Sequence, residues 1–228
     1  MHFARYRPKV TMPMDDQITI VASSYFQPIA DLIEKLTSHP MPVPGPAATS
    51  HRENGYSNAL VILFVTVLES YTARVRFVRP DDVALPGAIS TPDLLVAYFP
   101  DLPTYGDLLE VFMLRNLIAH NHVWHLDTSE GGEARTISTP QQLGFQTKKN
   151  YHQIIDVDTR RTRNLDFPAS PSSVDRSHVK KVFEVVWKTL EFMQKKDYSH
   201  TPLGGRTVGF KGRRRQLEHL IAELSPTP

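Results

Sequence analysis

The segment from Ser57 to Val78 constrains the fold more than any other part of this 228-residue chain. Its apolar residues are distributed nearly all round a helical repeat, which is the pattern of a helix that other helices cover on most sides. The longest apolar run, from Ala59 to Leu68, contains Thr66 and is too short to span a bilayer. We therefore expect a mainly α-helical protein, with no membrane partner, in which this helix is central to the core.

Three further segments have the periodicity of helices. Between Asp16 and His39, apolar residues recur at helical spacing, and Pro28 either bends this helix or lies in the first turn of its better-formed half. A short helix is expected from Asp93 to Tyr98, because Thr91-Pro92-Asp93 is typical of a helix start. The clearest helix extends from Val174 to Lys196, where one apolar stripe is formed by Val179, Val182, Phe183, Val186, Leu190 and Met193.

Shorter, extended segments precede that last long helix. Alternating apolar and polar residues predict strands or extended chain over Arg135–Ser138, Leu143–Thr147 and Tyr151–Val157. Pro168–Ser173 is expected to be a loop, with Ser172 or Ser173 capping the helix that follows. We therefore expect one helical domain over residues 1–200, with a small β-rich insertion at about 128–168. Residues 201–228 then form a basic tail with a short amphipathic helix.

The composition limits the chemistry that this chain can perform. Cysteine is absent, which excludes a disulfide framework, a cysteine-ligated zinc site and a thiol nucleophile. The segment from Met1 to Pro13 is basic and lacks the apolar centre of a signal peptide. Both observations favour a cytoplasmic location. The net charge of +2 is too small to predict nucleic-acid binding by itself.

The sequence Arg115-Asn116-Leu117-Ile118-Ala119-His120 carries the most informative chemistry. It lies near the end of an apolar, helix-like run from Asp107 to Trp124, which Tyr105 or Asp107 begins. An arginine is always charged and offers a planar set of donors that matches a phosphate, whereas an imidazole exchanges protons near neutral pH. On a helix, Asn116 and His120 are one turn apart, and the long side chain of Arg115 can extend towards them. This is the minimum set of groups for cleaving a phosphodiester without a metal.

This pattern of an arginine, a polar residue, three mostly apolar residues and a histidine resembles the signature of HEPN domains, an all-helical group rich in metal-independent ribonucleases. The resemblance covers roughly Tyr56 to His125, together with a closing helix near Val174 to Lys195. It implies a HEPN-like helical bundle with Arg115, Asn116 and His120 in the active site. The chain departs from the HEPN toxins that pair with nucleotidyltransferase antitoxins at His122, where those toxins carry tyrosine.

Two polar features near this motif each have two interpretations. Many HEPN nucleases carry an acidic residue in an earlier helix that faces the motif, and Glu69 is in the corresponding position. Glu69 either lies near Arg115 and His120 or forms a surface ion pair with Arg74 or Arg76. His120, His122 and His125, with Asp127, resemble a zinc cluster in residue type. Their irregular spacing and the missing fourth ligand argue against it, so we expect neither a metal nor another cofactor.

Basic residues gather in three places along the chain. A single cluster is more often a solvated surface than a binding site, but three clusters beside a nuclease-like motif favour contacts with an RNA backbone, because cations neutralise its phosphates. The candidate RNA-binding residues are Lys148, Lys149, Arg160, Arg161, Arg163, Arg213, Arg214 and Arg215. The last three follow Gly204-Gly205, so we expect them on a mobile element whose apolar side docks on the body or on a partner.

The resemblance implies a specific activity. We expect a metal-independent endoribonuclease that cleaves RNA by attack of the ribose 2′-hydroxyl, in a toxin, phage-defence or other stress-response setting. Family members commonly form homodimers in which the motifs of two protomers face each other, and an antitoxin or another regulatory protein is a possible further partner. The alternative is a catalytically silent HEPN domain that binds RNA, a nucleotide or a protein, because fold alone does not decide function.

Overall fold

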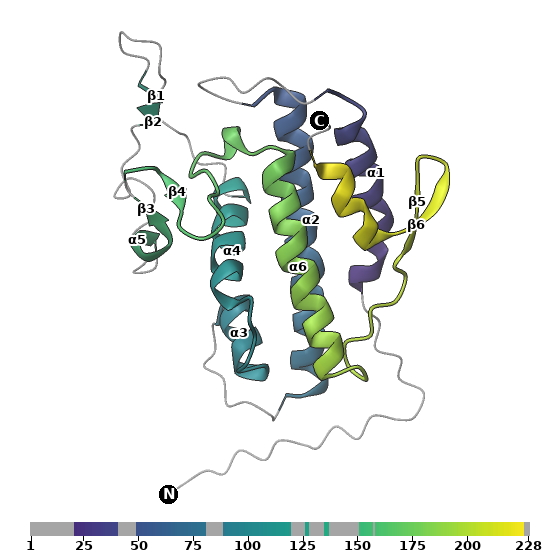
Figure 1. Cartoon of the computed structure of the whole chain (residues 1–228). Coiled ribbons are helices and arrows are strands. Elements are labelled where there is room, and N and C mark those ends of the chain that lie inside the picture. The colour runs from purple at the N-terminus through teal and green to yellow at the C-terminus, as the bar shows by residue number, and fades with distance from the viewer. Residues whose placement is uncertain are drawn as a thin grey trace, which may run out of the picture.

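The computed structural model describes residues 21–40, 49–80, 89–119, 126–127, 135–136, 151–156 and 158–225. This part of the chain is mainly helical, as the sequence predicted (Figure 1). Its four long or medium helices are α1 (Phe26–Thr37), α2 (His51–Val78), α4 (Tyr105–Ala119) and α6 (Arg176–Lys196). None of the described helices is both long enough and apolar enough to cross a membrane.

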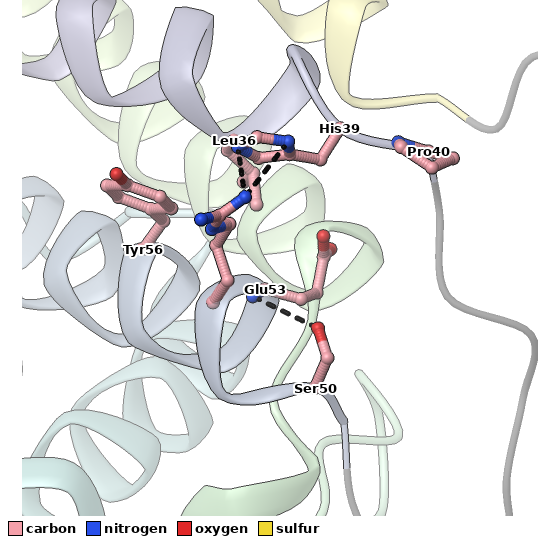
Figure 2. A pocket seen from close by; sticks show the side chains of 7 residues that line it. Leu36, His39, Pro40, Ser50, Glu53 and Tyr56 are labelled. Atoms are coloured by element: carbon pink, nitrogen blue, oxygen red, sulfur yellow. Dashed lines mark hydrogen bonds between the residues drawn. The ribbon is translucent and has the colours of Figure 1, made fainter.

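Helix α2 lies at the centre of the bundle and packs against α1, α4 and α6. It begins six residues before the predicted start, because Ser50 caps it: the backbone N–H of Glu53 donates to Ser50 Oγ at 3.3 Å (Figure 2). The Ser-x-x-Glu spacing of a capping box was the sequence signal for this start. Its buried side chains include Phe64, which stacks on Phe183 of α6 with ring centroids 4.4 Å apart.

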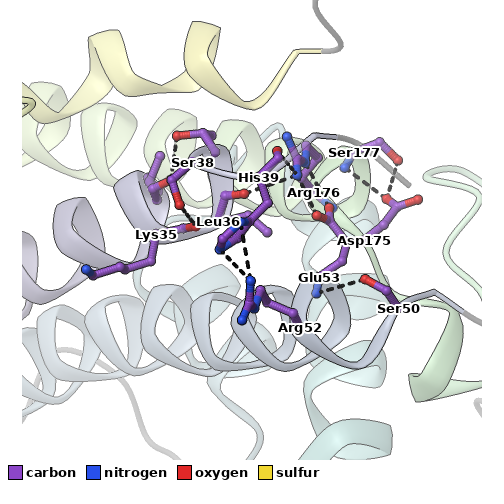
Figure 3. Close-up of polar contacts among 12 residues, drawn as sticks. Lys35, Leu36, Ser38, His39, Ser50, Arg52, Glu53, Asp175, Arg176 and Ser177 are labelled. Atoms are coloured by element: carbon purple, nitrogen blue, oxygen red, sulfur yellow. Dashed lines mark hydrogen bonds and ion pairs between the residues drawn. The ribbon is translucent and has the colours of Figure 1, made fainter. Parts of the chain in front are cut away.

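Helices α2 and α6 run in the same direction and are joined by an ion pair at each end. At their N-terminal ends, Arg176 and Glu53 are both buried, with Nη2 2.6 Å from Oε2 and Nε 2.9 Å from Oε1 (Figure 3). At their C-terminal ends, Arg79 Nη1 lies 3.1 Å from Asp197 Oδ2. The apolar stripe predicted for α6 is buried along its whole length. Together these contacts fix the register of the two longest helices.

The first turn of α6 is capped by Asp175, and the prediction of Ser172 or Ser173 as its cap was wrong. Asp175 Oδ1 accepts hydrogen bonds from the backbone N–H groups of Ser177 and His178 at 2.9 and 3.2 Å. The two serines lie instead in a short 3₁₀ helix, η3 (Pro171–Ser173). Asn54 of α2 holds this turn, because its Nδ2 donates to the carbonyl oxygens of Pro171 and Val174 at 2.6 and 3.0 Å.

Helices α3 (Thr91–Tyr98) and α4 follow α2 and lie on its other side from α1 (Figure 1). Ser90 lies one residue before the predicted start signal, and it caps α3 by accepting a hydrogen bond from the backbone N–H of Asp93. Directly before α4, Thr104 shares a buried hydrogen bond of 2.6 Å with Thr189 of α6. The first helix, predicted from Asp16, is described from Val21, with a 3₁₀ helix η1 (Val21–Tyr25) leading into α1.

The described strands are short and form three separate antiparallel pairs. The segment 151–157 was predicted to be extended, but its first half is a helical turn, α5 (Tyr151–Ile154), and its second half begins a strand, β3. The segment 143–147 and most of the predicted insertion lie outside the described residues. The pairs are β1 (Leu126–Asp127) with β2 (Arg135–Thr136), β3 (Ile155–Asp156) with β4 (Arg161–Thr162), and β5 (Thr207–Phe210) with β6 (Arg213–Gln216).

The last described segment docks on the bundle through its apolar side chains. The hairpin β5–β6 lies beside α1, and the amphipathic helix predicted there is present as a 3₁₀ helix, η4 (Leu217–Leu224), against α1 and α6 (Figure 1). Gln27 of α1 anchors the hairpin: its Oε1 accepts from the N–H of Gly209 at 2.8 Å, and its Nε2 donates to Gly209 O at 3.0 Å. The buried side chains that hold this segment are Val208, Phe210, Leu217, Leu220 and Leu224.

Candidate functional site

Glu69 of α2 and Arg115 of α4 form an ion pair between Arg115 Nη2 and Glu69 Oε1. These residues are 46 positions apart in the chain, and the packing of α4 against α2 brings them together. The Arg115 side chain is 25% exposed and the Glu69 side chain 36% exposed. The guanidinium is therefore held in a defined place while solvent, and hence a ligand, still reaches it. This contact with Arg115 belongs to the first of the two interpretations of Glu69.

Asn116 completes the polar group on α4. Arg115 Nη1 donates to Asn116 Oδ1 at 3.0 Å, and the guanidinium carbon lies 5.6 Å from the centre of the Phe112 ring. A guanidinium has five N–H donors, and these contacts with Glu69 and Asn116 engage two of its nitrogens. Arg115 therefore keeps donors for a phosphate oxygen while Glu69, Asn116 and Phe112 fix its direction.

The remaining candidate catalytic residue, His120, directly follows the last described residue of α4 and lies outside the described part of the chain. The same holds for His122 and His125 of the alternative metal cluster. Among the residues that the structure does describe, no group of three histidine or carboxylate side chains is arranged to hold a metal ion.

Glu110, which precedes Arg115 on α4, attaches a loop to the motif helix. Its carboxylate is buried and accepts from the backbone N–H groups of Asn164 and Leu165 at 2.8 and 2.7 Å. On the neighbouring face of α4, Leu109 and Met113 pack against Ile154, Ile155 and Ala169. The segment from β3 to residue 169 is thereby fixed against the same helix that carries Arg115.

This attached segment carries one of the predicted basic clusters, and two of its three arginines are engaged. Arg161 Nε lies 2.5 Å from Asp166 Oδ1, and Arg163 Nη1 lies 3.5 Å from Asp156 Oδ2. Hydrogen bonding by Arg161 holds the pKa of the Asp166 carboxyl below its usual value. Arg160, at a positive φ of 54°, is exposed at the turn between the strands and pairs with no carboxylate of the described residues. Lys148 and Lys149 lie outside the described residues.

The C-terminal arginines lie on the other side of the bundle from the helix that carries Arg115. The β5–β6 hairpin packs beside α1, on the opposite side of α2 from α4 (Figure 1). Arg215 Nη1 lies 2.6 Å from Glu223 Oε1, and Lys211 Nζ lies 2.7 Å from Glu223 Oε2. Arg213 and Arg214 are exposed without such a pair in the described part of the chain. The two basic clusters in the described part of the chain therefore lie on separate surfaces and do not form one patch around the motif.

Comparison of the chain with protein-family models, with curated proteins and with solved structures finds no match. The candidate site is therefore defined by its geometry alone. The sequence did not single out Glu110, which holds the backbone of Asn164 and Leu165 on the motif helix. Nor did it single out the buried pair of Glu53 and Arg176, which joins α2 and α6 away from this site. Glu110 did carry a signal, because a charged residue inside an apolar helix needs a partner when it is buried. Glu53 and Arg176 lie in polar first turns and carry no such signal.

Proposed function

We propose that this protein is a HEPN-like, metal-independent endoribonuclease that cleaves RNA at the site formed by Arg115, Asn116, His120 and Glu69. The observation that carries the proposal is the contact of Glu69 with Arg115. It brings the acidic residue of one helix onto the arginine of the motif, and it holds a partly exposed guanidinium in place. Electrostatic stabilisation by such a positioned charge is commonly the largest contribution to phosphoryl and acyl transfer.

In the proposed reaction, the ribose 2′-oxygen attacks the adjacent phosphorus and the bond from phosphorus to the 5′-oxygen breaks. The 2′-hydroxyl loses its proton and the departing 5′-oxygen gains one, so the products are a 2′,3′-cyclic phosphate and a 5′-hydroxyl. His120 transfers a proton at one of these oxygens. Arg115 binds the phosphate and stabilises the negative charge that develops on it. Asn116 and Glu69 fix the orientation of the Arg115 guanidinium, and Asn116 also orients the imidazole of His120.

The Arg160 turn is the surface that we propose for the RNA backbone next to this site. Glu110 binds the backbone of Asn164 and Leu165 and so holds the segment that carries this turn on the motif helix. Arg160 presents a charge that no described carboxylate neutralises. We further propose a two-fold homodimer that brings two motifs together, with an antitoxin or a regulatory protein as a possible additional partner. A two-fold interface uses the same surface on both protomers. Light scattering at micromolar concentration would then report twice the mass of one chain.

The test is RNA cleavage in EDTA by the wild type and by Arg115→Ala, His120→Ala and a control, Lys188→Ala. Lys188 is an exposed residue of α6 outside the site. We expect cleavage by the wild type and the control, and a loss on the order of 100-fold or more in both site variants. Full EDTA inhibition that zinc reverses would point to the histidine cluster instead. RNA binding without cleavage would favour the alternative function, a catalytically silent HEPN domain that binds RNA.

A further inference from the structure

A hollow lies at the N-terminal end of α2, where α1 ends. It has a volume of about 310 Å³, at the lower end of the range for small-molecule pockets. Figure 2 shows its labelled residues around a common space between the end of α1 and the start of α2. The lining residues are Leu36, His39, Pro40, Ser50, Arg52, Glu53 and Tyr56.

Arg176 of α6 joins two of the segments that line this hollow. Its Nη2 donates to the carbonyl oxygens of Leu36 and His39 at 3.1 and 3.2 Å, and its Nε and backbone N–H both donate to Glu53 Oε1 at 2.9 Å (Figure 3). One buried arginine therefore fixes the end of α1 and the start of α2 together. The positions of the lining residues do not depend on a ligand to order them.

The charge at the mouth of the hollow is positive. Arg176 neutralises the Glu53 carboxylate, because the two side chains are paired and buried. Arg52 is exposed and pairs with no carboxylate of the described residues; its Nη1 lies 3.3 and 3.4 Å from the two ring nitrogens of His39. A guanidinium has five N–H donors, and those of Arg52 that do not face His39 are available to a phosphate.

The rest of the lining is Ser50, whose Oγ accepts from the Glu53 N–H, and the apolar or aromatic Leu36, Pro40 and Tyr56. Leu36 is buried beneath the hollow, and the ring of Tyr56 forms a wall on the α2 side (Figure 2). We propose that this hollow binds a small phosphate monoester, with its phosphate against Arg52 and His39 and its organic group against Leu36 and Tyr56. The proposal is independent of RNA cleavage, since Arg52 and Glu69 are separated by about 25 Å of helix.

The test is calorimetric titration of the full chain, at constant ionic strength, with phenyl phosphate, inorganic phosphate and benzoate as separate probes. The variants are Arg52→Gln and Tyr56→Leu, with Arg76→Gln as the control, because Arg76 is an exposed arginine near the opposite end of the same helix. We expect saturable binding of phenyl phosphate by the wild type and the control with equal Kd. Arg52→Gln should weaken the binding of both phosphates on the order of 10-fold, since it removes one charge-assisted hydrogen bond.

Tyr56→Leu should weaken phenyl phosphate binding and leave inorganic phosphate binding unchanged, because only the organic group reaches the ring. Benzoate should bind more weakly than phenyl phosphate, because its planar carboxylate carries less charge. Absence of saturable phosphate binding by the wild type, or an equal Kd in Arg52→Gln, would overturn the proposal. Circular dichroism checks that each variant is folded, and the Arg52→Gln result decides the question even if Tyr56→Leu unfolds.

Discussion

Glu69 and Arg115 contact each other across the packed faces of α2 and α4, and both side chains remain partly open to solvent. A half-exposed ion pair contributes little to folding, typically about 0–1 kcal/mol. Its more important effect is geometric, because the carboxylate and Asn116 Oδ1 restrict the directions that the guanidinium can take. The pair therefore links the architecture of the bundle to the chemistry proposed for it.

Replacing Glu69 by glutamine tests this positioning role. We expect the free energy of unfolding to change by less than about 1 kcal/mol, since the pair is partly exposed. The turnover rate with RNA should fall by about 10-fold or more, because the guanidinium is no longer aligned with the developing charge. The RNA concentration at half-maximal rate should not rise, because no cation is removed. A variant with unchanged kcat would show that Glu69 does not position Arg115.

The buried pair of Glu53 and Arg176 should contribute far more to stability. We expect Glu53→Gln and Arg176→Met each to lower the free energy of unfolding by about 3–5 kcal/mol, because each leaves its buried partner charge uncompensated. The double variant should lose less than the sum of the two. Urea unfolding measures these differences. The control is Arg163→Met at a half-exposed pair, for which we expect less than about 1 kcal/mol; equal losses at both pairs would contradict the assignment.

The positions of the main helices could be predicted from the sequence, but the contacts that join them could not. The stripe from Val179 to Met193 predicted α6 because apolar side chains at helical spacing must be buried together. The start of α6 was misplaced because Ser172 and Ser173 are good caps by residue type, whereas the backbone places Asp175 at the cap. The hairpin was missed because β6, with three arginines in succession, has no apolar alternation and is held through Phe210 and Val208 of its partner strand.

The candidate site was predictable in part. Arg115 and Asn116 were identified from residue types on a helix, and the contact between them is local. The contact of Arg115 with Glu69 was one of two interpretations of Glu69, and it came from the family resemblance. Periodicity alone does not encode it, because only the tertiary packing brings these two helices together. The buried partners of Glu53 and Glu110 were beyond prediction for the same reason.

The cap of α6 gives a prediction for pH dependence. Burial alone would raise the pKa of the Asp175 carboxyl, but hydrogen bonds from His178 and Ser177 hold that pKa well below its usual range. The charged carboxylate therefore adds stability above the unfolded pKa of about 3.9, and this contribution disappears as the pH falls through the lower, folded pKa. Asp175→Ala should cost about 1–2 kcal/mol at pH 7, and the deficit should shrink below about pH 4.

Urea unfolding at pH 7 and pH 3 measures this change, with Ser173→Ala as the control. Ser173 lies two residues before the cap and has no side-chain hydrogen bond in the described structure, so we expect a change within about 0.5 kcal/mol. Asp175→Asn keeps an acceptor at the cap and should lose less stability than Asp175→Ala at pH 7. An Asp175→Ala deficit that is the same at both pH values would show that the carboxylate charge is not responsible.

The exposed arginines of the C-terminal hairpin should affect RNA binding without affecting the chemical step. Arg213→Ala with Arg214→Ala should flatten the logarithmic salt dependence of binding by roughly 0.7 for each single-strand phosphate that is no longer neutralised. Arg215 is left unchanged because it pairs with Glu223. The hairpin lies beside α1, across the bundle from the helix α4 that carries Arg115, so cleavage of a dinucleotide should be unaffected (Figure 1). An unchanged salt slope with a long RNA would assign these arginines to solubility or to a protein interface.

The identity of the product ends tests the central claim most directly. RNA incubated with the purified protein in EDTA should yield fragments that end in a 2′,3′-cyclic phosphate and begin with a 5′-hydroxyl. A matched substrate with 2′-deoxyribose at the cleaved position should remain intact, because it lacks the attacking oxygen. Fragments that begin with a 5′-phosphate, or cleavage of the deoxy substrate at the same rate, would contradict the mechanism proposed for Arg115 and His120.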